Sequence, residues 1–89
     1  MQAVITVTGK DSVGIIAKVS QKCVECNVNI VDISQSVLKD YFAMIMVVEI
    51  DKLNIAFTEF VDEMSKIGND NGLSIHTMHE DIFNSMHRI

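Results

Sequence analysis

Two cysteines form the pattern in this sequence that most directly suggests redox or metal chemistry. Cys23 and Cys26 make a C-x-x-C motif. In redox proteins this motif stands at the start of a helix, where the helix dipole lowers the pKa of a thiol. Here both cysteines lie near the expected end of a helix and on its apolar side. A free cysteine is commonly buried, so we expect both thiols to pack in the core.

Three histidines raise the question of a metal site. His76 and His79 have opposite parity on an expected strand, so their side chains point to opposite faces of a sheet. His87 lies apart from them in the C-terminal tail. These positions do not match the usual spacing of zinc ligands. We therefore expect no metal site and no cofactor, and we expect exposed histidines.

Catalysis would need a nucleophile beside a base, or a pair of carboxyl groups held around a pocket. The best nucleophile in the sequence is Cys26, and no spacing brings it beside a histidine. No pair of carboxylates is placed on rigid elements around an expected pocket. We therefore expect a protein that is not an enzyme.

Length and charge restrict the class of protein further. The 89 residues suffice for one domain with a modest core. The formal net charge of −5 and the scattered basic residues argue against binding to nucleic acid or to an anionic membrane. No apolar run approaches the ~20 residues of a membrane span, and no signal peptide is recognisable. Two cysteines do not make a disulfide framework, so we expect a cytoplasmic protein.

Four segments have the period or composition of β-strands. The apolar phase of the second shifts between Ile30 and Ile33, which predicts a bulge. Lys39 and Asp40 are expected to form a two-residue hairpin turn. Residues 41–48 are apolar on both faces, which predicts a strand in the middle of a sheet. The four expected strands are residues 2–8, 28–38, 41–50 and 73–79.

Two further segments have the period of amphipathic helices. The first follows a turn in which Asp11 or Ser12 can cap the helix, and it stops near Asn27. The second is expected to take its cap from residues 51–54 and to end within residues 68–72. The apolar faces are Ile16, Val19, Cys23 and Cys26 in the first helix, and Phe57, Phe60, Val61, Met64 and Ile67 in the second.

The order strand, helix, strand, strand, helix, strand predicts an α+β fold of the ferredoxin-like βαββαβ type. Both helices would cover one face of a four-stranded antiparallel sheet and leave the other face open. Ile82, Met86 and Ile89 give the tail, residues 80–89, a short amphipathic pattern. Either this tail or a second subunit must cover the open face, so we expect a homodimer or a higher even oligomer.

The segment from Ile5 to Ser34 resembles an ACT domain. An acidic residue, Asp11, stands two positions after Gly9, and Gly14 then opens the first helix before an apolar pair. The helix leads through Asn27-Val28-Asn29-Ile30 into the second strand. The spacing is similar to that of short stand-alone ACT proteins and of the ACT domain at the head of formyltetrahydrofolate deformylases. The order of elements extends the resemblance over residues 1–79.

The resemblance implies a ligand site. ACT domains bind amino acids or other small molecules at dimer interfaces and regulate attached or associated enzymes. In members that bind an amino acid, the ligand lies between the first turn and the second strand of a neighbouring subunit. Asn29 matches an asparagine that holds the ligand there, whereas Asp11 and Gly9 replace an asparagine and a histidine of such members. The implied site is Gly9, Lys10, Asp11, Ser12, Val13, Gly14, Ile15, Asn29 and Ile30.

The residues themselves support a more general version of this site. Free amides at the start of a helix suit an anionic group, and Gly14 leaves the backbone uncovered. Structural roles remain open, with Asp11 and Ser12 as a helix cap, Gly14 as a helix–strand contact and Asn29 as a turn residue. Two functions follow. One is a regulatory module that binds an amino acid and modulates a partner enzyme, and the alternative is a purely structural or protein-interaction dimer without a ligand.

Overall fold

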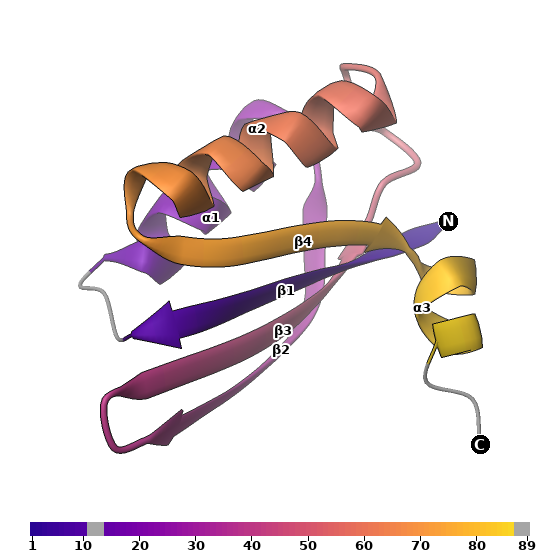
Figure 1. The fold of residues 1–89 in the computed structure, drawn as a ribbon. Coiled ribbons are helices and arrows are strands. Elements are labelled where there is room, and N and C mark those ends of the chain that lie inside the picture. Colours follow the sequence, from indigo (N-terminus) through magenta and orange to yellow (C-terminus); the bar gives the residue numbers. More distant parts are fainter. Residues whose placement is uncertain (11–13, 87–89) are drawn as a thin grey trace.

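The chain forms a four-stranded sheet with two helices on one face and a short third helix on the other side (Figure 1). The computed structural model describes residues 1–10 and 14–86, and at Leu38 the backbone alone. The elements are β1 (Gln2–Lys10), α1 (Ile15–Glu25), β2 (Asn29–Leu38), β3 (Tyr41–Glu49), α2 (Phe57–Asp70), β4 (Leu73–His79) and α3 (Glu80–Met86).

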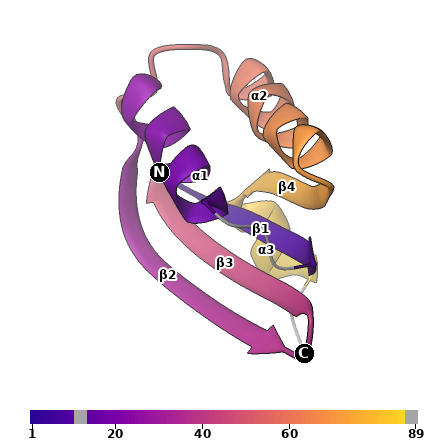
Figure 2. The same ribbon diagram turned by 90° about the vertical axis from the view of Figure 1, so that its left-hand side faces the viewer.

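The strands lie in the order β2-β3-β1-β4, and all three pairings are antiparallel. Figure 2 shows α1 above the β2 and β3 side of the sheet and α2 above the β4 side. The ferredoxin-like α+β prediction is thus confirmed. The expected bulge is present between Ile30 and Asp32, and β3 lies inside the sheet as its apolar composition predicted.

The core lies between the sheet and the pair α1 and α2. Every second residue of β1 and β3 is buried on this face, as the period of a strand requires. Both cysteines are buried in the same cluster, which confirms the expectation that they pack in the core. Its central members are Ile5, Val7, Val19, Cys23, Met44, Met46, Val48, Phe60 and Met64.

Helix α1 buries a face that differs from the predicted one by a single residue. Ile15 is 2% exposed and Ile16 is 37% exposed, so the expected place of Ile16 in the core is wrong. The helix begins at Ile15, and Gly14 before it adopts a left-handed φ of 81°. This start fixes the rotation of α1 about its own axis. As a result, Ile15, Val19 and Cys23 form the side of the helix that is buried in the core. The predicted caps, Asp11 and Ser12, lie outside the described residues.

Strand β1 continues two residues past its predicted end. Gly9 is paired with Phe42 and Leu73, and Lys10 with Tyr41, so neither residue belongs to a turn. The strand extends because β1 has a partner on each side up to Gly9 and β3 alongside it at Lys10. A Cβ atom at Gly9 would lie 2.5 Å from Cδ2 of Leu73, so the missing side chain permits close packing there.

Helix α2 departs from the prediction at its start. Its N-cap residue is Ala56, without a side-chain hydrogen bond, rather than a residue from 51–54. Asn54 instead donates from Nδ2 to the carbonyl of Glu25 at 2.9 Å, because the loop passes the end of α1 and satisfies a free carbonyl there. The helix ends at Asp70, within the predicted run 68–72. Gly68 is still inside α2 and is buried, and a Cβ atom there would lie 2.7 Å from the carbonyl oxygen of Leu73.

Replacing Gly68 with alanine should destabilise the protein by about 1–3 kcal/mol, because the added methyl group meets backbone atoms of β4 that cannot move aside. Alanine normally favours a helix over glycine by up to about 1 kcal/mol, so the sign of the effect reports the contact. Urea denaturation measures it. The matched control is Asn69→Ala, an exposed α2 position, where a change within about 0.5 kcal/mol is expected. A stabilising Gly68→Ala would contradict the contact.

The cysteines should be unreactive in the native protein. Burial, and to a lesser extent the neighbouring Cys26, raises the pKa of the Cys23 thiol from 9.0 to about 11. Burial likewise raises the pKa of Cys26. Because the thiolate is the reactive form, alkylation at about pH 8 should be at least ~10-fold slower than in urea, and should accelerate as the pH approaches 11. Equal rates in the folded and unfolded protein would point to functional thiols instead.

Candidate functional site

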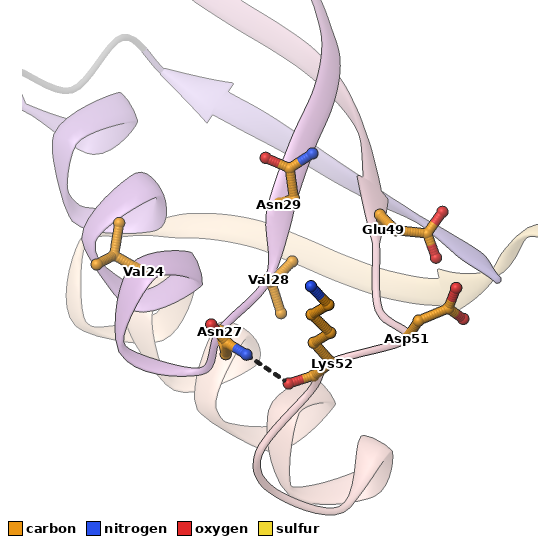
Figure 3. A pocket seen from close by; sticks show the side chains of 7 residues that line it. All are labelled: Val24, Asn27, Val28, Asn29, Glu49, Asp51 and Lys52. Atoms are coloured by element: carbon orange, nitrogen blue, oxygen red, sulfur yellow. Dashed lines mark hydrogen bonds between the residues drawn. The ribbon is translucent and has the colours of Figure 1, made fainter.

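A cavity of about 460 Å³ lies where α1 ends, β2 begins and the chain leaves β3 (Figure 3). It contains Asn29, which the sequence predicted as a site residue, together with groups from three other segments. The cavity is open to solvent, so a small molecule can enter it without a change in the fold. Its lining residues are Val24, Asn27, Val28, Asn29, Glu49, Asp51 and Lys52.

The floor of this cavity is built by the turn that ends α1. Asn27 has a left-handed φ of 62°, a conformation that asparagine tolerates better than most residues. Its Nδ2 atom donates to the carbonyl of Lys52 at 2.9 Å, and Val28 donates from its backbone amide to the carbonyl of Cys23 at 2.8 Å. Asn27 therefore holds the two walls of the cavity together. Its side-chain NH₂ group is engaged in this contact and serves the structure of the site.

The two carboxylates of the cavity, Glu49 and Asp51, are already paired with the N-terminal ammonium group of the protein. The Met1 ammonium donates to Oε1 of Glu49 and to Oδ1 of Asp51, at 2.7 Å in each case. Hydrogen bonds to Asp51 and Glu49 raise the pKa of this amino group to about 10. The same contact lowers the pKa of Asp51. The one ammonium group offsets one of the two negative charges, so this side of the cavity keeps a net negative charge.

Lys52 and Asn29 supply the polar groups of the cavity that remain available to a ligand. Neither side chain has a hydrogen bond or an ion pair within residues 1–10 and 14–86. Figure 3 shows Lys52 extending from the loop toward β2, where Asn29 lies. An ammonium group and an amide that can both donate and accept suit a carboxylate or another small anionic group. The sequence reasoning missed Lys52, because it treated residues 51–54 as a helix cap.

The predicted site residues lie at two separate ends of the molecule. Lys10 and Gly9 are at the far end of β1, and Gly14 precedes the first residue of α1. Asn29 follows the other end of α1, which has 11 residues and is therefore about 16 Å long. Residues 11–13 lie outside the described part of the chain. A single chain thus does not bring Asn29 to the turn that the resemblance pairs it with.

Three of the predicted residues have clear local roles. Gly14 is exposed, and a Cβ atom built there would meet nothing within 4 Å, so the expected close helix–strand contact is absent. The residue is needed for its left-handed backbone, which favours glycine. The side chain of Ile15 is buried in the core, and that of Ile30 is packed against it. Ile15 therefore anchors the start of α1, and Ile30 anchors the start of β2 beside Asn29.

A second and broader cavity, of about 650 Å³, lies along the outer side of α1 and α2. Four of its polar side chains are engaged, whereas Gln21 and Asp70 have no hydrogen bond or ion pair within the described residues. Lys18 donates from Nζ to Oδ1 of Asn71 at 2.6 Å, and Lys22 lies 3.1 Å from the carboxylate of Glu25. Both of its lysines are engaged in these contacts, so this cavity lacks the free ammonium group that Lys52 gives the cavity at Asn29.

Metal binding and membrane crossing both need features that the described residues lack. Within residues 1–10 and 14–86, no group of three or more histidine, cysteine or acidic side chains is arranged to hold a metal ion. In that part of the chain, no helix has the length and the apolar composition that crossing a bilayer requires. His76 is exposed, and His79 forms an edge-to-face contact with Phe57.

Comparison with known proteins identifies the family and supports the fold. The ACT domain family matches residues 1–77. A UPF0237 protein of Listeria monocytogenes is 46% identical over 89 residues, which is 100% of both chains. The ACT domain protein from Streptococcus pneumoniae has a TM-score of 0.80 and 42% identity over 98% of each chain. A formyltetrahydrofolate deformylase from Pseudomonas syringae has the same fold, with a TM-score of 0.78 and 22% identity, over 88% of this chain and 27% of its own. The chain therefore belongs to the ACT domain family.

Proposed function

We propose that this protein is a non-catalytic regulatory module, a single ACT domain over residues 1–89, that binds an amino acid between two subunits of a homodimer. The observation that carries the proposal is an apolar surface along the β2 edge and α1, which adjoins the cavity at Asn29. ACT domains are regulatory ligand-binding domains. The interface, the site and the ligand follow from the residues around that cavity.

The proposed interface is the outer edge of β2. This strand has β3 on one side and no strand on the other, so its outward backbone groups can pair with another chain. Apolar side chains are exposed on β2 and on the neighbouring helix α1, and such a surface is costly to leave in water. Val24 belongs both to this surface and to the cavity. The exposed apolar residues are Ile16, Val24, Val31, Ile33 and Val37.

Antiparallel pairing of two β2 strands would bring the separated halves of the site together. Lys10 is opposite Tyr41, and Tyr41 is opposite Leu38, so β1 ends at the end of the sheet where β2 also finishes. Asn29 lies at the other end, where β2 begins. In an antiparallel pair, the beginning of one strand lies beside the end of its partner. Asn29 of the partner subunit would then lie near Gly14 and the turn before it.

The groups at such a joint site suit a zwitterion. Lys52 and Asn29 can bind a carboxylate, and so can the free amides at the start of α1. The sequence places an acidic residue, Asp11, in the turn before α1, and this residue would favour an ammonium group. A ligand that carries both charges, such as a free amino acid, fits this combination better than a simple anion.

The regulated partner would be a separate protein, in our view an enzyme. The likeness to a much longer formyltetrahydrofolate deformylase shows that this fold also occurs within an enzyme chain. Binding of an amino acid at the boundary between subunits would change the surface that the dimer presents to its partner.

Ligand binding is tested first by a thermal-shift screen of the free amino acids, since a ligand that binds the native state raises the melting temperature. For the ligand so found, Asn29→Ala and Lys52→Ala should each weaken binding by about 1–2 kcal/mol in calorimetry, because each removes a polar partner. Asn69→Ala, an exposed asparagine on α2, is the matched control and should bind normally. If no amino acid shifts the melting temperature, the purely structural dimer becomes the better description.

The interface is tested separately by the mass of the assembly. Val37→Lys places a charge on the β2 edge, where burial against a second copy would be strongly unfavourable. We expect light scattering at micromolar concentration to show that the chains no longer associate through this edge, with the fold retained by circular dichroism. Lys39→Glu, in the exposed hairpin turn, serves as a control for altered charge and should assemble normally. An unchanged mass for Val37→Lys would show that subunits do not meet at β2.

A further inference from the structure

The sheet face opposite α1 and α2 is only half covered by the chain. Helix α3 lies on this side and packs against β1 and β4 (Figures 1 and 2). At that end of the face Val4 is 5% exposed, although it points away from the main core. Toward the other end Ile45 is 43% exposed and Tyr41 is exposed as well. The cover therefore stops partway along the strands.

The uncovered half is nearly free of charge. Among its described residues, Lys10 at the end of β1 is the one with a full charge, and small hydroxyl side chains surround Ala43 and Ile45 of β3. A membrane surface or a nucleic acid would call for several basic residues. The outward residues of this half are Thr6, Thr8, Lys10, Ser34, Ser36, Tyr41, Ala43, Ile45, Ser74 and His76.

Helix α3 presents an apolar side that its own chain does not cover. Glu80 and Phe83 are half-buried, so this side of the helix faces the sheet. Ile82 and Met86 are 56% and 65% exposed, and their spacing of four residues puts them together on another side of the helix. The chain thus leaves one apolar side of α3 exposed, and it also leaves one half of a sheet face uncovered.

We propose that two copies of this chain pack with their open sheet faces toward each other, so that α3 of each copy covers the uncovered half of the other. A two-fold axis between the sheets and perpendicular to the strands reverses the strand direction. It therefore places the α3 end of one sheet over the uncovered end of the other. Each α3 then lies between two sheets, with its Glu80 and Phe83 side toward its own chain and with Ile82 and Met86 toward the partner's.

The surface buried in this contact has two parts. Four strands about 4.8 Å apart and about seven residues long, at about 3.3 Å per residue, give a whole face of roughly 400–500 Å² in projection, and the uncovered half is about half of that area. The exposed side of α3 adds to it. The contact therefore lies at the small end of specific interfaces, below the ~800 Å² per partner of the standard size. This contact lies on a different surface from the β2 edge, so the two together would give a tetramer.

The experiment measures the mass of the assembly by sedimentation equilibrium on the full chain at micromolar concentration. With both contacts, four chains of 9.9 kDa give about 40 kDa. The double variant Ile82→Asp and Met86→Asp should halve this mass, and so should Ile45→Lys on the receiving face. Ile45, Ile82 and Met86 are exposed in a single chain, so these variants should keep the fold, as circular dichroism can show. Asn69→Asp, on the exposed side of α2, adds a charge elsewhere and should leave the mass unchanged.

The β2 variant separates this proposal from the proposed function. Val37→Lys alone should leave pairs held through α3, and combining it with the α3 double variant should leave monomers. Loss of assembly in the α3 variant with normal assembly in Val37→Lys supports the α3 contact and contradicts the β2 contact. An unchanged mass in both the α3 double variant and Ile45→Lys would show that something other than a second copy meets this face, and would overturn the proposal.

Discussion

Two helices cover one face of a four-stranded sheet and no more, and the rest of this structure follows from that constraint. On the covered face, β1 and β3 lie in the middle and bury every second side chain under α1 and α2. On the other face, the side chains of Val4 in β1 and Ile45 in β3 point away from α1 and α2. Among the described residues, α3 is the one further helix or strand that can cover this second face. The apolar surfaces that remain are therefore available for contacts between molecules.

The length of α1 determines how far apart the predicted site residues lie. Helix α1 carries the chain from one end of the sheet to the other, so the turn before Gly14 and the strand that starts at Asn29 lie about one helix length apart. Site residues that are neighbours in the family pattern are thus separated in one subunit. In the dimer that we propose, a second subunit completes the site, which would link ligand binding to assembly. In such an arrangement, a ligand would stabilise the dimer and the dimer would strengthen ligand binding, since the two equilibria are coupled.

The loop between β3 and α2 has a larger role than its length implies. Asn54 donates to a carbonyl group at the end of α1, and the Lys52 carbonyl accepts from Asn27, so the loop closes the end of the helix. The same loop brings Asp51 to the Met1 ammonium and leaves the Lys52 ammonium group at the cavity. A segment with the composition of a helix cap therefore supplies one wall of the candidate site. Its hydrogen bonds to α1 hold that wall in place.

Local patterns in the sequence determined the order of the elements, the bulge after Ile30 and the family, because strand and helix periods depend on neighbours a few residues apart. Contacts between distant segments decided the rest. The start of α1 after Gly14 turned Ile15 inward in place of Ile16, and the close approach of β4 explains why Gly68 lies inside a helix. Likewise, the approach of Lys52 to Asn29 depends on a loop meeting the end of another helix. Such contacts between distant segments arise from packing in three dimensions. The spacing of residues along the chain does not encode them.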